Sequence, residues 1–173
     1  MEPDEATRRY YQESLRTHGD TPTGVDWKDT DSQTLRFQRI LAHMNLAQPC
    51  RILDLGCGTG ALYQYLTDVL DSERFHYTGV DLVQEMVDIA SQKHQGANVT
   101  FLCGDMATVQ SQYDYVIASG IMNVKQQVTS ERWQSWILQT ISAMFNRCEK
   151  GVVFNALSAY VDFSDEKLFY SDP

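Results

Sequence analysis

The chain has 173 residues, 43% of them hydrophobic and 21% charged, which is enough for one globular domain with a packed core. Its formal net charge of −9, with no run of Lys or Arg, argues against nucleic acid as a partner. The first residues lack the basic and apolar regions of a signal peptide, and no apolar run reaches membrane-spanning length, so we expect a cytoplasmic protein without a membrane partner.

Residues 1–46 are expected to form a lid followed by a helix, ahead of the main domain. Residues 1–30 are polar and contain a turn-rich run, HGDTPTGVDW, from His18 onward. Asp31 and Ser32 are good N-cap residues. Apolar residues then recur at i, i+3, i+4 and i+7, the spacing of an amphipathic helix: Phe37, Ile40, Leu41 and Met44.

Residues 47–173 alternate between expected strands and expected helices. Apolar strands are expected at 51–55, 76–81, 99–103, 113–119 and 151–157. Helical spacing begins at Ala61, again near Met86 with a stop at Gly96, and again after Ser130, which is expected to be an N-cap. This alternation predicts an α/β fold with a doubly wound, mostly parallel sheet and helices on both faces. Ligands of such folds bind at the carboxyl ends of the strands.

The first expected strand ends in a glycine loop that predicts a nucleotide-type cofactor. The run Ile52–Gly60 reads ILDLGCGTG. Between a buried strand and a helix, such a loop lets backbone amides approach a ligand at the positive end of the helix dipole. Gly56, Gly58 and Ala61 also fit the looser dinucleotide pattern, so the loop alone does not identify the cofactor.

Asp54, two residues before the first glycine, separates the candidate cofactors. A dinucleotide pyrophosphate is an anion, which a carboxylate under the loop would repel. S-adenosylmethionine carries an ammonium and a sulfonium, so an acid at this position favours it. An NAD-dependent oxidoreductase is disfavoured for the same reason.

Acidic residues at the next two strand ends extend the site. Asp81 comes about 20 residues after the loop, where a carboxylate can accept from both ribose hydroxyls; the alternative is a helix cap. Asp105 is expected to accept from the adenine amine, with Met106 and Leu82 on either side of the ring; the alternative is a simple turn. Ser119 begins the loop after the fourth strand, at the methyl-donor end of the pocket.

Together these motifs resemble class I S-adenosylmethionine-dependent methyltransferases over roughly residues 48–157. The matching runs are ILDLGCGTG, YTGVDL, FLCGDM, YDYVIASGIMN and GVVFNAL. The resemblance implies a Rossmann-like methyltransferase fold, with the glycine loop and Asp54 at the methionine part, Asp81 at the ribose, and Asp105 with Met106 at the adenine. The expected cofactor-binding residues are Asp54, Gly56, Cys57, Gly58, Gly60, Asp81, Leu82, Gly104, Asp105, Met106 and Ser119.

The upstream segment resembles that of small bacterial members of unassigned substrate, in which it forms a lid over the cofactor. Arg36 is a candidate to reach the cofactor carboxylate, with a plain surface arginine as the alternative. Candidate acceptor bases are Tyr10, Tyr11, His18 and Asp26. None of these four is favoured over an ordinary lid contact, so no catalytic residue is assigned.

The chain departs from the family pattern at two places. The loop Ser119–Met122 lacks the Asn/Asp/Ser-Pro-Pro-aromatic motif of enzymes that methylate nucleic-acid bases. Family members continue after the fifth strand with a helix and an antiparallel strand pair, whereas only residues 158–173 remain here, and Tyr170–Pro173 read as a helix start. We therefore expect a truncated C-terminal part and a homodimer through the unpaired edge of the fifth strand.

The predicted function is in-line methyl transfer from S-adenosylmethionine to a small molecule, with S-adenosylhomocysteine as the product. The alternative is a non-catalytic module of the same fold that binds or regulates. The cysteines at 50, 57, 103 and 148 form no CxxC and have no His at metal-ligand spacing. We therefore expect free thiols and no metal site.

Overall fold

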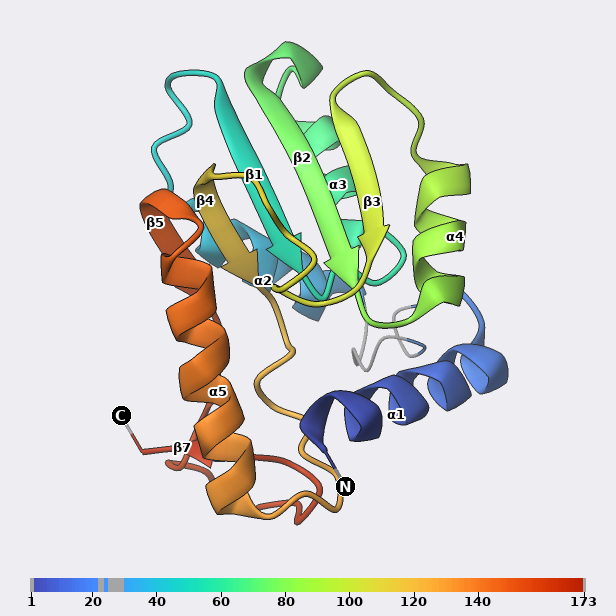
Figure 1. The fold of residues 1–173 in the computed structure, drawn as a ribbon, viewed down its shortest axis with the longest axis vertical. Helices are drawn as coiled ribbons and strands as arrows, with labels where there is room; N and C mark the ends of the chain where they lie inside the picture. Colours follow the sequence, from blue (N-terminus) through green and yellow to red (C-terminus); the bar gives the residue numbers. More distant parts are fainter. Residues whose placement is uncertain (1, 22–23, 25–29, 173) are drawn as a thin grey trace.

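Five strands form the central sheet in the order β3-β2-β1-β4-β5, and every neighbouring pair is parallel (Figure 1). The computed structural model describes residues 2–21, 24 and 30–172. The strands are β1 (Cys50–Leu55), β2 (Phe75–Asp81), β3 (Val99–Cys103), β4 (Tyr113–Ala118) and β5 (Cys148–Phe154). The strand order reverses between β1 and β4, the point at which a ligand crevice opens in doubly wound folds. The predicted fold class is confirmed.

Different helices pack on the two faces of the sheet, because alternate strand residues point to opposite sides. On one side, Ile52 and Tyr77 belong to a core shared with α2 and α3. On the other side, Leu53 and Val116 belong to a core shared with α5. The helices after the N-terminal one are α2 (Thr30–Leu41), α3 (Ala61–Val69), α4 (Gln84–Lys93) and α5 (Ser130–Phe145).

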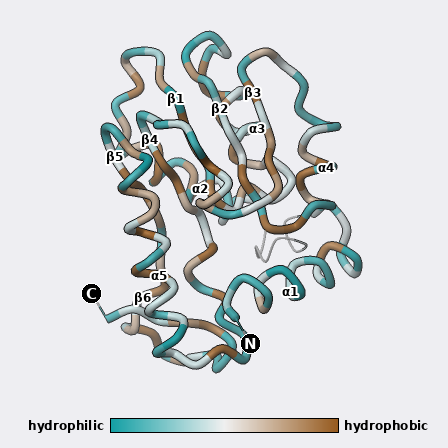
Figure 2. Tube along the Cα trace, viewed as in Figure 1, coloured by the Kyte–Doolittle hydropathy of each residue, from teal (hydrophilic) through white to brown (hydrophobic). Residues whose placement is uncertain are grey.

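α1 (Pro3–His18) runs across the carboxyl ends of the strands, where the sequence predicts a lid but no helix (Figure 1). Pro3 is well suited to the first turn, and Gly19, with a φ of 65°, ends the helix. Few of its residues are apolar, and Figure 2 shows it as largely hydrophilic, so periodicity gives little signal for it. The Arg8 Nε donates to the Leu82 carbonyl over 3.2 Å and joins α1 to the loop after β2.

The segment after β5 differs from the prediction. β6 (Leu157–Ser158) and β7 (Tyr170–Ser171) pair in a separate two-stranded sheet. An antiparallel bridge between Val124 and Leu168 joins this segment to the loop after β4. The predicted helix start at the C-terminus is therefore wrong for Tyr170 and Ser171, and Pro173 lies outside the described residues.

Several predicted boundaries also shift. β5 begins and ends three residues before the predicted strand 151–157 and lies at one edge of the sheet. Thr129 rather than Ser130 caps α5, because its side chain accepts from the Arg132 N–H. α4 gives way to extended backbone at His94, before the expected stop at Gly96. The expected division into residues 1–46 and 47–173 stays a prediction. None of the described helices is both long and apolar enough to cross a bilayer.

Candidate functional site

A cavity of about 600 Å³ lies at the carboxyl ends of the strands and is walled by α1, α2 and α5. This volume falls within the roughly 300–1,000 Å³ of small-molecule sites. Ten of the eleven residues expected to bind the cofactor line it: Asp54, Gly56, Cys57, Gly58, Asp81, Leu82, Gly104, Asp105, Met106 and Ser119. The structure therefore brings together residues that are up to 65 positions apart in the sequence, counting from 54 to 119.

The glycine loop has backbone conformations that favour glycine. Gly56 has a φ of 78°, and a Cβ placed on it would lie 2.1 Å from Cγ2 of Ile121. The loop after β4 therefore approaches the glycine loop as closely as it does because Gly56 has no side chain. Gly60 does not line the cavity: it begins α3 with a φ of 86°, and a Cβ there would lie 2.6 Å from Cδ2 of His94. Its role is to shape the loop.

Asp54 is a buried carboxyl group, only 2% exposed, whose side chain accepts a hydrogen bond of 2.5 Å from the Tyr77 hydroxyl. Burial raises its pKa to about 7, against the opposing effect of the Tyr77 bond. No ion pair joins Asp54 to another described residue. A bound cation would supply the missing partner and favour the ionised form, so this carboxyl group fits the ammonium or sulfonium of S-adenosylmethionine.

Tyr77 escaped the sequence-based prediction. Tyr77 lies on β2 and is paired in register with Ile52 of β1. Because Ile52 comes two residues before Asp54 on the same strand, Tyr77 is close enough for its hydroxyl to reach the Asp54 carboxyl group. A buried Tyr hydroxyl usually needs a hydrogen-bond partner, so a tyrosine in a buried strand next to an acidic strand end was the sequence feature that could have indicated this bond.

Asp81 ties the glycine loop to the turn after β2. Its two carboxylate oxygens accept from the Gly58 N–H at 2.8 Å and from the Val83 N–H at 2.9 Å. Burial raises the pKa of Asp81, and these backbone bonds oppose the rise. A carboxylate oxygen can accept more than one hydrogen bond, so capacity remains for ribose hydroxyls. Asp81 is not a helix cap, because α4 begins at Gln84 and its N-cap residue is Val83.

Asp105 is exposed at the mouth of the cavity, and its side chain accepts from the Ala107 N–H over 2.8 Å. A bond from a side chain to the N–H two residues later is typical of a turn, so Asp105 does form the turn that the sequence offered as the alternative. One carboxylate oxygen makes that bond, and the residue still lines the cavity beside the buried Met106. The adenine contact stays a prediction.

The loop after β4 is held by Asn123, which belongs to the predicted loop at the end of the fourth strand, and by Asn155, which the sequence did not single out. The Gly120 N–H donates to Asn155 Oδ1 at 2.8 Å, and Asn155 Nδ2 donates to Ser119 Oγ at 3.3 Å. The Asn123 Oδ1 accepts from the Leu157 N–H at 3.1 Å. Asn155 fell inside the predicted fifth strand, so its position as the residue that follows the strand was missed.

The upstream candidates divide between the cavity and its surroundings. Tyr11 and Arg36 line the cavity, whereas Tyr10 and His18 do not. Asp26 lies outside the described residues. Further lining residues that the sequence did not suggest come from α1, α2 and α5: Asp4, Thr7, Gln33, Trp136, Gln139 and Thr140.

Among the described residues, the cysteines form no disulfide, and the side chains of the kinds that bind metals form no metal site. All four cysteines are free, and burial raises the pKa of the Cys57 thiol well above its usual range. A neutral thiol is a poor nucleophile. No group of three or more His, Cys, Asp or Glu that could hold a metal ion occurs among the described residues.

Comparison with known proteins gives the family. The family model described as "Methyltransferase domain" matches residues 52–140. Rv1506c of Mycobacterium tuberculosis, which bears a provisional methyltransferase name, is 38% identical over 135 residues, covering 75% of this chain and 78% of Rv1506c. The cyclopropane-fatty-acyl-phospholipid synthase of Escherichia coli is 29% identical over 99 residues, and the match covers 55% of this chain but only 25% of that enzyme.

A solved structure shows the same fold. Magnesium protoporphyrin IX methyltransferase from Synechocystis PCC 6803, crystallised with bound S-adenosylmethionine, aligns with a TM-score of 0.62 at 18% identity, covering 99% of this chain and 80% of that one. The family model and the mycobacterial relative agree with what the glycine loop and the acids at the strand ends indicate. The chain belongs to the class I S-adenosylmethionine-dependent methyltransferases.

Proposed function

We propose that this methyltransferase binds S-adenosylmethionine along the carboxyl ends of β1, β2 and β3 and methylates a small molecule held between α1 and α5. The observation that carries the proposal is the shape of the cavity. The same cavity is lined by Asp54 and the glycine loop, by Ser119, and by Trp136 on α5. One partly enclosed space therefore offers room for a cofactor and for a second compound beside it.

Each part of the cofactor has a fitting partner in the proposal. Asp54 takes the ammonium of the methionine part, and Arg36 is placed on the cavity wall for its carboxylate. Asp81 accepts from the ribose hydroxyls, and Asp105 with Met106 takes the adenine. The protein contributes alignment of the two reactants and exclusion of water, while the bound cofactor supplies an activated methyl group.

The binding test compares three compounds by titration calorimetry. S-adenosylmethionine and S-adenosylhomocysteine should bind, and NAD should not; the reverse pattern would remove the proposal. Asp81→Ala should weaken binding by about 1–3 kcal/mol, because charge-assisted hydrogen bonds to the ribose are lost. Asp71→Ala, on the exposed N-cap of a short 3₁₀ turn outside the cavity, is the matched control. Turnover to S-adenosylhomocysteine with small-molecule and nucleic-acid acceptors then tests the acceptor class.

We further propose a homodimer through the edge of β5. Phe154 on this strand is 40% exposed, and an unpaired strand edge offers backbone groups for pairing with a second chain. A change of Phe154→Lys should shift a dimer towards the monomer in light scattering. A wild-type chain that is monomeric at high concentration would refute this part of the proposal.

A further inference from the structure

The cavity contains a compartment that no cofactor contact explains. We call it the α1–α5 compartment, and it is lined by Asp4, Thr7 and Tyr11 of α1 and by Trp136, Gln139 and Thr140 of α5. Figure 1 shows the N-terminal end of α1 beside the lower half of α5, from which the helix runs away. The compartment reaches the glycine loop through Ile121, because a Cβ on Gly56 would meet that side chain.

The face that α1 turns to this compartment is polar. Asp4, Thr7 and Tyr11 recur at i, i+3 and i+7, so they share one face of the helix. A helix that only covers a core turns apolar residues inward. Thr7 is 9% exposed, and its buried Oγ1 has no hydrogen-bond partner among the described residues. A buried hydroxyl without a partner is unfavourable, so α1 keeps a polar side chain at this position at a cost to stability.

Asp4 is the charged member of this face, and the structure fixes its orientation. The Trp136 Nε1–H donates to Asp4 Oδ1 over 2.8 Å, which leaves Oδ2 available to the compartment. Trp136 is itself held by stacking on the buried Trp133, with ring centroids 4.7 Å apart. No cation of the described residues forms an ion pair with Asp4.

The charges around the whole cavity select against anions. The carboxyl groups on its described wall are those of four acids, Asp4, Asp54, Asp81 and Asp105, and the one basic side chain there is that of Arg36. In a partly enclosed space the field of these acids attracts cations and repels carboxylates and phosphates. Three of the acids are needed by the cofactor under the proposed function, and Asp4 remains for the acceptor.

We propose that Asp4 is an acceptor-binding residue and that the α1–α5 compartment takes an acceptor with an apolar body and an amino group. The amino group donates to Asp4 Oδ2, and the rings of Trp136 and Tyr11 pack against the apolar body. This inference rests on the proposed function, because the acceptor compartment is defined by a cofactor at the glycine loop.

The test uses three probes that share a ring and differ in head group: 2-phenylethylamine, 2-phenylethanol and phenylacetate. Each is titrated calorimetrically into the full chain saturated with S-adenosylhomocysteine. The amine should bind most tightly and phenylacetate least. Asp4→Asn should weaken the amine at least about tenfold and bring it level with the alcohol, since a hydrogen bond to a charged group is lost.

Two further variants separate recognition from folding. Glu5→Gln removes the neighbouring acid of the same helix, which pairs with Arg9 outside the cavity, and should leave all three affinities unchanged. Trp136→Phe keeps the aromatic stack but removes the N–H that orients Asp4. It should weaken the amine selectively, and the double variant with Asp4→Asn should lose little more than Asp4→Asn alone, because the two residues act together.

The outcomes distinguish this inference from the proposed function. Failure of S-adenosylhomocysteine to bind overturns the proposed function. If it binds normally, the inference is overturned by phenylacetate binding as tightly as the amine, by an unchanged amine affinity in Asp4→Asn, or by the absence of binding of all three probes.

Discussion

The buried carboxyl group of Asp54 should make cofactor affinity depend on pH near neutrality. Burial raises its pKa to about 7, so about half of the free protein carries the ionised form at pH 7 and about one hundredth at pH 5. The ammonium of the cofactor favours the ionised form. Affinity for S-adenosylhomocysteine should therefore fall roughly fiftyfold, or about 2.3 kcal/mol, between pH 7 and pH 5.

Asp54→Asn tests this reasoning because it resembles the protonated carboxyl group and still lets the Tyr77 hydroxyl donate. The variant should bind at pH 7 with about the affinity that the wild type shows near pH 5, and its own affinity should vary less with pH. Titration calorimetry at pH 6 in two buffers of different ionisation enthalpy should show about one proton released on binding by the wild type, and less by the variant.

Asp81 and His94 also titrate, so the decisive quantity is the difference between the wild type and Asp54→Asn. Equal pH slopes and equal proton release in the two proteins would refute the assignment of the titrating group to Asp54.

Three further predictions follow from neighbouring contacts. Tyr77→Phe removes the bond that lowers the pKa of Asp54, so the pH profile of cofactor affinity should move to higher pH in the same calorimetric series, and an unmoved profile would contradict the role of the bond. Gly56→Ala places a side chain at a φ of 78° and a Cβ 2.1 Å from Cγ2 of Ile121. The variant should therefore lower the free energy of unfolding by about 1–3 kcal/mol, as measured by urea titration. An unchanged unfolding midpoint would count against the close approach of the two loops. Burial lowers the pKa of His94, so the unfolded state binds a proton that the folded state does not, and stability should be lost as pH falls below about 6.5. His94→Gln should flatten this acid-side loss in thermal melts relative to the wild type, and parallel melting curves in the two proteins would exclude His94 as its source.

The sequence could predict the sheet and most of the site because both depend on local patterns. Buried parallel strands appear as short apolar runs, and residues that follow them meet at one edge of the sheet. That rule alone placed Asp54, Asp81 and Ser119 around one cavity. Gly60 does not line the cavity, and the pattern could not show this, because it identifies a glycine without saying whether the glycine faces the ligand or the helix behind it.

The rest required long-range information. The Tyr77 bond to Asp54 depends on the register of two strands, and the Trp136 bond to Asp4 joins residues 132 positions apart. Neither can be read from periodicity. α1 was missed because its cavity face is polar, so it lacks the apolar stripe by which amphipathic helices are recognised.

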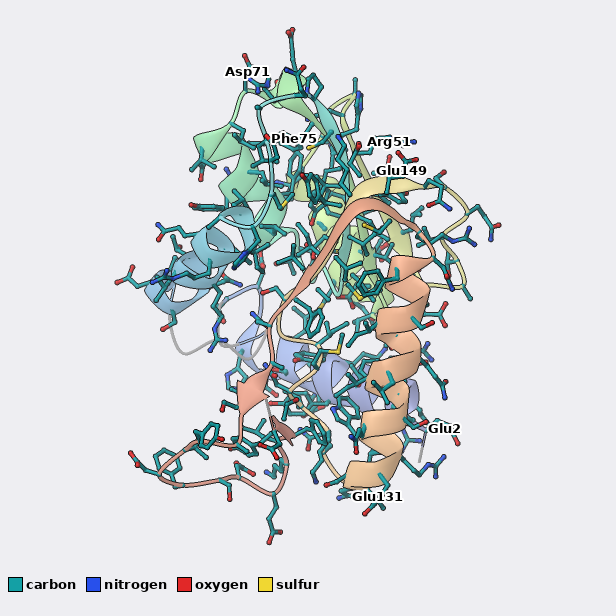
Figure 3. All side chains as sticks on the ribbon, turned by 90° about the vertical axis from the view of Figure 1, so that its left-hand side faces the viewer. Glu2, Arg51, Asp71, Phe75, Glu131 and Glu149 are labelled. Atoms are coloured by element: carbon teal, nitrogen blue, oxygen red, sulfur yellow. The ribbon has the colours of Figure 1, made fainter. Side chains whose placement is uncertain are left out.

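The attachment of α1 has a consequence for the exchange of cofactor and product. Its N-terminal end is anchored to α5 by the Asp4 bond and by an ion pair between Glu2 and Arg132, and Figure 3 shows Glu2 beside the lower half of α5. The contacts of its later turns include exposed hydrogen bonds, one of them of 3.4 Å from Gln12 to Glu85. Detachment should therefore begin at the C-terminal end of α1 and uncover the side of the cavity near Leu82 first, so that the α1–α5 compartment stays closed while S-adenosylhomocysteine leaves. Hydrogen exchange that is faster at residues 13–18 than at residues 6–8 would show this direction of opening, and the opposite order would rule it out.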